Sequence, residues 1–119
     1  MQYLALIYAE DGVGPKPGDA EWDDYMNGFF SANKAYADAG VMNGGNALQH
    51  TETATSVRIR DGKTETMDGP FAETKERLGG YYLLDCKDLD QAIEMAALIP
   101  TARFGTIELR PIMQIPGDG

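Results

Sequence analysis

A run of charged side chains at positions 68–76 is the first place where this sequence could do chemistry. It reads Asp-Gly-Pro-Phe-Ala-Glu-Thr-Lys-Glu. A carboxylate held beside a Gly-Pro turn can act as a general base, as a metal ligand or as the acceptor of an Asx turn. A structural turn therefore explains Asp68 as well as a catalytic role does. We predict Asp68 as the catalytic base or its orienter and keep the turn as the alternative.

The other residues of this run are candidate binding groups. Pro70 has no backbone N–H to donate, so a strand that precedes it must end there. The ring of Phe71 is predicted to anchor the loop to the body of the protein. Glu73, Lys75 and Glu76 are then candidate ligand-binding side chains, with ordinary solvated loop charges as the alternative.

One histidine and a few arginines outside the run are candidate partners for its carboxylates. His50 is the only histidine, and histidine is the side chain that most readily exchanges a proton near neutral pH. We predict a His50–Asp68 acid/base pair, with an exposed loop histidine as the alternative. Arg110 and Arg58 (or Arg60) are predicted to meet these carboxylates or a substrate anion, with surface salt bridges as the alternative.

Metal and cofactor signals are weak in this sequence. No paired His or Cys spacing indicates a metal site. There is no haem motif, although one histidine suffices for an axial haem ligand. We predict no metal and no tightly bound cofactor.

The elements that must position these residues follow from hydrophobic periodicity. The run at 3–9 is apolar at both odd and even positions, which predicts a central strand covered on both faces. The aromatic residues that follow recur at spacings of three and four, which predicts a helix capped by Asp19 and ended by Gly40. Asp61-Gly62 predicts a hairpin turn. The predicted strands cover residues 3–9, 41–48, 56–60, 63–67, 81–85 and 105–112, and the predicted helices cover 19–40 and 88–100.

This order of elements indicates the fold class. Strand, helix, strand, hairpin, strand, helix, strand fits a ferredoxin-like α+β sandwich, in which two helices cover one face of an antiparallel sheet and a hairpin is added. The length of 119 residues suits one domain, residues 1–119. Because the first strand is apolar on both faces, we predict a homodimer that covers the open face of the sheet.

Composition narrows the classes of partner. The net charge is -9, which disfavours direct binding of nucleic acid. The single cysteine, Cys86, cannot form an internal disulfide and is predicted to be buried. The apolar run at 3–9 is too short to span a membrane and has no basic flank, so we expect a soluble, cytoplasmic protein without a membrane anchor.

The string at 68–76 matches, letter for letter, the signature of the DGPFAETKE family, a group of YCII-related domains. The apolar start, the hairpin, Gly79-Gly80-Tyr81-Tyr82 and the terminal strand also resemble that family's layout. The resemblance implies a dimeric α/β-barrel fold. It also implies a His-Asp pair, but the family's histidine belongs near the start of the first helix, where this sequence has none.

Two functions remain open at this point. One is a small enzyme that does acid/base chemistry on a polar small molecule, with Asp68, His50 and Arg110 in its site. The other is a non-catalytic ligand-binding or regulatory module. Because members of the resembled family are encoded beside, or fused to, extracytoplasmic-function sigma factors, the resemblance implies such a factor as a protein partner. The ligand and the reaction do not follow from the residues.

Overall fold

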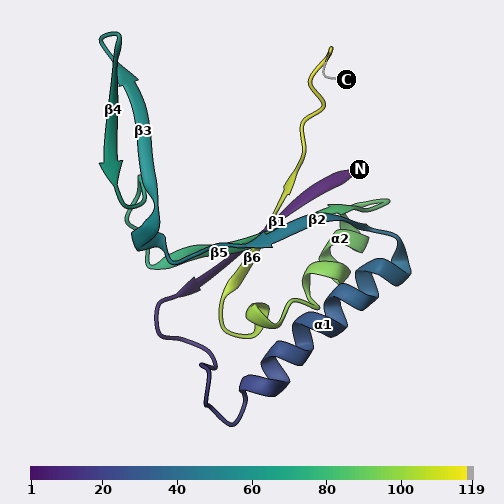
Figure 1. The fold of residues 1–119 in the computed structure, drawn as a ribbon. Coiled ribbons are helices and arrows are strands. Elements are labelled where there is room, and N and C mark those ends of the chain that lie inside the picture. The colour runs from purple at the N-terminus through teal and green to yellow at the C-terminus, as the bar shows by residue number, and fades with distance from the viewer. Residues whose placement is uncertain (118–119) are drawn as a thin grey trace.

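The computed structural model describes residues 1–117 and shows a layered α+β molecule with one projecting hairpin (Figure 1). The last two residues of the predicted domain lie outside this range. The strands are β1 (Gln2–Glu10), β2 (Met42–Ala47), β3 (Thr55–Arg60), β4 (Lys63–Asp68), β5 (Glu76–Asp85) and β6 (Thr106–Pro111). The helices are α1 (Trp22–Ala39) and α2 (Leu89–Ala96), with short 3-10 turns η1 (Thr51–Thr53) and η2 (Pro100–Arg103).

Four strands form an antiparallel sheet in the order β2-β5-β1-β6. As predicted, β1 lies inside the sheet, between β5 and β6. Both helices lie on the same face of the sheet (Figure 1). This arrangement is the predicted ferredoxin-like α+β fold, in which each helix connects two strands that are not neighbours.

The core fills the space between the helices and the sheet. Alternation along β1 turns Tyr3 and Ala5 toward the helices, where they meet Leu84 of β5 and Tyr36 of α1. Cys86 is buried in the same cluster, as predicted. Burial raises the pKa of its thiol above the ordinary value of 9.0, which leaves the thiol protonated and unreactive at neutral pH.

One end of α1 is as predicted from the sequence and the other is not. Gly40 ends the helix in the left-handed conformation, with φ of 70°, as predicted. The predicted start at Asp19 is wrong, because α1 begins at Trp22. The Asp19 carboxylate instead accepts a hydrogen bond from the Lys16 N–H at 2.8 Å, which closes a turn in the preceding loop.

The hairpin β3–β4 is a separate two-stranded sheet that projects away from the body, and we call residues 55–68 the arm (Figure 1). Asp61 and Gly62 have φ of 53° and 75°, the pair of positive values that a type I′ turn requires. Val57 and Ile59 lie on one face of the arm and are 63% and 65% exposed. The arm thus carries apolar side chains that nothing in the single chain covers.

Strand β5 begins earlier than predicted. No strand was predicted between residues 67 and 81. This is wrong, because β5 starts at Glu76, which pairs with Glu10 of β1. A register shift opposite Ile7 and Tyr8 separates this first part from the apolar part of β5. No helix within residues 1–117 is both long and apolar enough to cross a bilayer.

Candidate functional site

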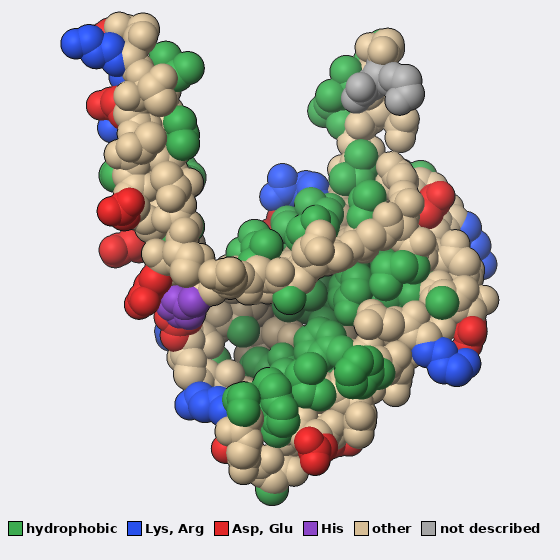
Figure 2. Space-filling model, in the orientation of Figure 1, with side chains coloured by type: hydrophobic (Ala, Val, Ile, Leu, Met, Phe, Trp, Pro, Cys, Tyr) green, Lys and Arg blue, Asp and Glu red, His purple; other side chains and the backbone are tan. Residues whose placement is uncertain are grey.

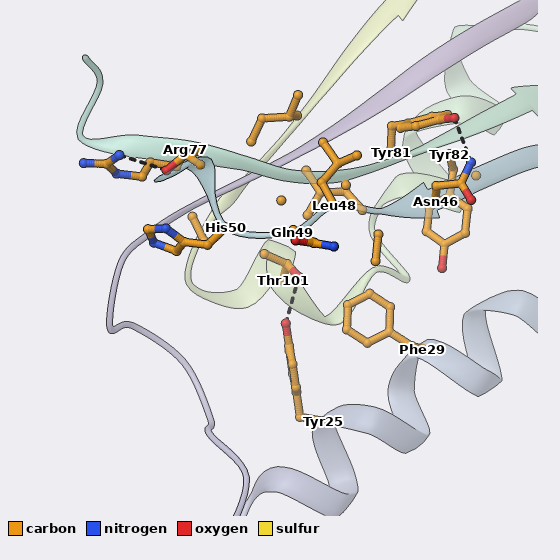
Figure 3. Close-up of a pocket in the computed structure, with 18 of the residues that line it drawn as sticks. Tyr25, Phe29, Asn46, Leu48, Gln49, His50, Arg77, Tyr81, Tyr82 and Thr101 are labelled. Atoms are coloured by element: carbon orange, nitrogen blue, oxygen red, sulfur yellow. Dashed lines mark hydrogen bonds between the residues drawn. The ribbon is translucent and has the colours of Figure 1, made fainter. Parts of the chain in front are cut away.

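A cleft of about 920 Å³ lies between α1 and the strands β2 and β5. Tyr25 and Phe29 rise from α1 toward the strands and form one wall (Figure 3). Their rings meet edge to face at 5.2 Å, and Tyr25 also packs against Phe104 at 5.7 Å. The Tyr25 hydroxyl lies 3.1 Å from the Thr101 hydroxyl. These contacts hold the aromatic wall in place.

Hydrogen bonds orient both tyrosines of β5, whose side chains point to opposite faces of the sheet, Tyr82 toward the helices. The Tyr82 hydroxyl donates to the Asn33 side-chain oxygen at 2.8 Å. The Asn46 amide donates to the Tyr81 hydroxyl at 2.9 Å, as Figure 3 shows. Burial raises the pKa of Tyr82 above 10.0. Its hydroxyl is therefore a neutral hydrogen-bond donor at physiological pH.

The loop after β1 closes another side of the cleft. Gly14 lies against the ring of Phe104, and a Cβ at this position would be 2.4 Å from the ring. Its φ of 83° is also one that glycine adopts most easily. The density of glycine and proline in this loop is thus explained partly by its close approach to an aromatic ring.

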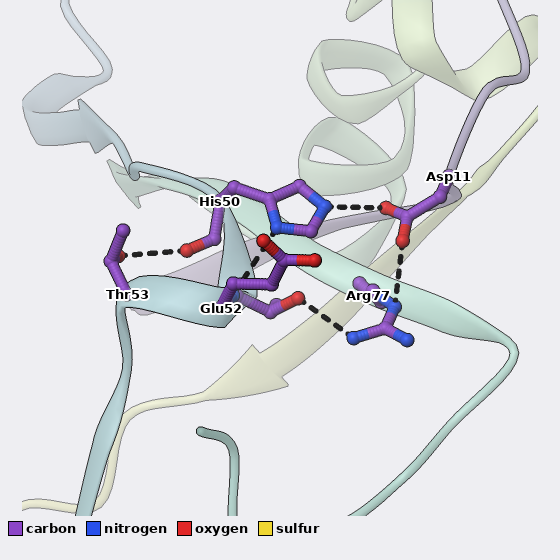
Figure 4. A network of polar contacts seen from close by, with 6 residues as sticks. Asp11, His50, Glu52, Thr53 and Arg77 are labelled. Carbon is purple, nitrogen blue, oxygen red and sulfur yellow. Dashed lines mark hydrogen bonds and ion pairs between the residues drawn. The ribbon is translucent and has the colours of Figure 1, made fainter. Parts of the chain in front are cut away.

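A polar cluster at the mouth of the cleft joins three side chains from distant parts of the chain (Figure 4). His50 Nε2 lies 3.1 Å from one carboxylate oxygen of Asp11, and Arg77 Nε lies 3.1 Å from the other. Arg77 also donates to the Thr51 hydroxyl at 2.9 Å. We call Asp11, His50 and Arg77 the mouth cluster.

The histidine of this cluster has both ring nitrogens engaged. The Glu52 backbone N–H donates to His50 Nδ1 at 3.2 Å and so caps η1. Because a backbone amide is always a donor, Nδ1 must be the acceptor, and the proton of the neutral ring resides on Nε2, facing Asp11. In this arrangement His50 has no free lone pair to act as a base.

This hydrogen-bond pattern gives the first testable prediction. In ¹⁵N-¹H correlation spectra of the imidazole, neutral His50 should be the Nε2–H tautomer, and its signals need no assignment because it is the only histidine. Asp11→Asn should leave the tautomer in place, since Glu52 sets it, while shifting the Nε2 resonance. A predominant Nδ1–H tautomer would contradict the arrangement. The variant's unfolding free energy should fall by less than about 1 kcal/mol, because the pair is half exposed.

The predicted catalytic pair is not formed. His50 contacts Asp11 instead of Asp68. Asp68 ends β4 on the exposed arm, opposite Thr55, and its carboxylate makes no hydrogen bond or ion pair with any residue in 1–117. It does not line the cleft.

The predicted anchor is also wrong. Phe71 is 87% exposed, because the chain between β4 and β5 passes beside the arm, away from the core. Its ring lines a groove of about 360 Å³ on the arm together with Val57 and Met67. The run 68–76 therefore joins the arm to the sheet and does not reach the cleft.

The remaining predicted binding residues have separate surroundings. Glu76 accepts a hydrogen bond from the Thr106 hydroxyl at 2.8 Å, and Lys75 lies 3.5 Å from Glu10. Glu73 is exposed. Arg58 pairs with Glu65 across the arm at 3.2 Å, and Arg110 pairs with Glu108 on its own strand. Both arginines therefore form surface salt bridges, which was the alternative to a role in binding.

Sequence reasoning missed two members of the mouth cluster. Asp11 opens a loop rich in glycine and proline, and Arg77 lies in the first part of β5, which was not predicted as a strand. The one available signal was that Asp11 directly follows a buried strand, the kind of position from which a loop side chain can reach a site.

Within residues 1–117 no three His, Cys, Asp or Glu side chains gather closely enough to hold a metal ion.

Comparison with known proteins gives the family. The model of the YCII-related domain matches residues 1–116. The chain belongs to the YCII-related family. An uncharacterised protein of Rhizobium meliloti (strain 1021) is 36% identical over 121 residues, which cover 99% of this chain and 98% of that protein. The similarity of this YCII-related chain to that protein thus extends over nearly the whole of both chains.

Proposed function

We propose that this YCII-related protein binds a small molecule in the cleft between α1 and the strands β2 and β5. The observation that carries the proposal is the cleft itself, at about 920 Å³, within the range of roughly 300–1,000 Å³ that small-molecule sites occupy. Its aromatic wall supplies apolar contact, and the mouth cluster supplies the few polar groups that fix orientation. The ligand thus has an apolar body and a polar end.

Amide chemical shifts test this proposal. A library of small polar and aromatic fragments is added to the ¹⁵N-labelled protein, and shifts are expected at residues 44–50 and 79–82, which line the cleft. Amides at the tip of the arm, residues 60–63, should not move. A library in which no fragment shifts the cleft amides would contradict the proposal.

Two neighbouring phenylalanines provide a matched control. Phe29 lines the cleft, whereas Phe30 is 64% exposed and does not. Phe29→Leu should weaken every fragment that binds in the cleft, and Phe30→Leu should leave these affinities unchanged. Equal effects of the two substitutions would place the binding elsewhere.

Acid/base catalysis is a second candidate function, favoured by the position of a histidine–carboxylate pair at the mouth of the cleft. Catalysis by His50 requires that Nδ1 first lose the Glu52 N–H, so we place it behind simple binding. Fragments that bind are incubated in D₂O, and deuterium incorporation is followed by NMR. Incorporation by the wild type but not by His50→Gln supports catalysis, whereas equal incorporation excludes a role for His50.

The sigma-factor partner stays a prediction from the family resemblance.

A homodimer is the assembly that best accounts for the uncovered apolar surfaces. Leu4, Leu6 and Leu83 alternate with the core residues and lie half-buried on the open face of the sheet. Hydrophobic side chains gather there between the arm and the C-terminal segment (Figure 2). A two-stranded hairpin is only marginally stable alone in water, so the arm also needs a surface to pack on. We propose that a second copy covers both.

The mass in solution tests this assembly. Light scattering after size exclusion should give twice the mass of the chain for the wild type. Ile59→Glu, on the apolar face of the arm, should shift the mass toward one chain, because a buried carboxylate is costly. Leu89→Glu is the control, since Leu89 is 50% exposed on a helix on the opposite side. A wild type with the mass of one chain would contradict the proposal.

A further inference from the structure

We infer that the ligand of the cleft is a planar, conjugated molecule of one or two rings that carries a carboxylate. This inference rests on the proposed binding function and adds the class of ligand. It follows from the two walls of the cleft and from the one arginine at its mouth, which come from separate parts of the chain.

The wall formed by α1 presents aromatic faces and edges. Tyr25 and Phe29 are nearly perpendicular, at 86°, and Phe104 packs on Tyr25 from the other side. The link between the Tyr25 and Thr101 hydroxyls limits rotation of the phenol. Preorganised rings favour an aromatic guest, because stacked and edge-to-face pairs add stabilisation beyond that of buried area alone.

Part of the wall formed by the sheet consists of residues with small side chains, set among larger ones such as Ile7, Leu48 and Tyr82. Ala9, Ala47, Gly79 and Gly80 line the cleft without a side chain beyond Cβ. A Cβ at Gly80 would be 3.0 Å from the Asn46 carbonyl oxygen, so a larger residue there would require the backbone of β2 to shift by a few tenths of an ångström. These small residues expose flat backbone in a cleft that the aromatic rings also line, and such surfaces suit a flat molecule better than a puckered one.

The mouth supplies a directed cation. Among the residues 1–117 that line the cleft, Arg77 is the one lysine or arginine. Its Nε and Nη1 bind Asp11 and Thr51, which fixes the plane of the guanidinium. Nη2 makes no hydrogen bond with the described part of the chain, and the side chain is 34% exposed. A fixed guanidinium with free N–H groups is suited to a carboxylate, through short charge-assisted hydrogen bonds.

Three matched probes test the inference by NMR titration of the cleft amides. The first is 2-naphthoate, which is planar and anionic. The second is decahydro-2-naphthoate, which keeps the charge and approximate size but is puckered, and the third is 2-naphthamide, which is planar and uncharged. We expect 2-naphthoate to bind about 3- to 10-fold more tightly than the saturated acid and about 10-fold more tightly than the amide.

Two pairs of variants assign these preferences to residues. Arg77→Gln should abolish the preference for carboxylate over amide, and Lys75→Gln should retain it, since Lys75 is an exposed cation outside the cleft. Phe29→Leu should reduce the preference for the planar acid, and Phe30→Leu should retain it. If Phe29→Leu does not fold, Phe104→Leu makes the same test from the other side of Tyr25.

The outcomes separate this inference from the proposed function. Equal affinity for the planar and saturated acids, or for the acid and the amide, overturns the inference even when all three bind in the cleft. Binding of other fragments but of none of the three also overturns it, and leaves the proposed function standing. A cleft that binds no fragment at all overturns both.

Discussion

Replacing Gly105 by alanine is expected to lower the unfolding free energy by about 3 kcal/mol or more, since overpacking without room to relax reaches this size. A Cβ at this position would lie 2.1 Å from the Tyr8 carbonyl oxygen, 3.1 Å from Thr101 and 3.2 Å from Ala9. The first of these atoms is backbone of the central strand and cannot move aside alone. The substitution must therefore separate the start of β6 from β1.

The same residues link this prediction to the cleft. Gly105 directly follows Phe104, and its N–H donates to the Thr101 carbonyl at 2.7 Å. Both Phe104 and Thr101 line the cleft. A shift of β6 away from β1 should thus disturb the aromatic wall, and Gly105→Ala should lose fragment binding as well as stability.

Gly79→Ala is the matched control for Gly105→Ala. Gly79 lies in the same sheet, and a Cβ there would meet only the Ile7 carbonyl oxygen, at an ordinary 3.9 Å. Neither glycine has a positive φ, so backbone strain does not enter the comparison. Urea denaturation of both variants should show a change of at most about 1 kcal/mol for Gly79→Ala. Similar losses of unfolding free energy for Gly105→Ala and Gly79→Ala would contradict the prediction, because the structure would then relieve the close contact at Gly105 without cost.

Much of the fold was predictable because its signals are local. The apolar run at 3–9 and the helical stripe after it specify a buried strand and an amphipathic helix without reference to the rest of the chain. Asp61-Gly62 specifies its turn through two positive φ angles. Such patterns are sufficient to order the elements, and their order gives the ferredoxin-like topology.

The candidate site was less predictable because it depends on long-range geometry. Asp11 and His50 are 39 positions apart and meet only after the cleft has formed between the sheet and the loop that follows β1. The start of β5 carries charged residues that lack strand periodicity, and it is specified by pairing with β1. The direction of the arm decides whether Phe71 is buried, and no residue of the run 68–76 encodes that direction.

Removal of one hydroxyl from the core should change both the stability and its dependence on alkaline pH. Tyr36 is fully buried, and its hydroxyl donates to the Met95 carbonyl at 2.6 Å. Tyr36→Phe removes this hydrogen bond, while the Met95 carbonyl still accepts from the Leu98 N–H at 3.1 Å, so the unfolding free energy at pH 7 should fall by about 0.5–1.5 kcal/mol. The link between α1 and α2 is the contact that is lost.

The pH dependence follows from the direction of the pKa shift. Burial, with smaller contributions from Tyr82 and Cys86, raises the pKa of Tyr36 well above its ordinary 10.0. Above pH 10 the unfolded chain releases this proton while the folded chain keeps it, so the wild type should lose up to about 1.4 kcal/mol per pH unit through this group. Tyr36→Phe lacks that loss. Urea denaturation between pH 7 and 11.5 should therefore show the unfolding free energies of the wild type and Tyr36→Phe converging as pH rises. In absorbance at alkaline pH, the variant should have one fewer late-titrating tyrosine than the wild type. Parallel stability curves would mean that Tyr36 titrates alike in both states.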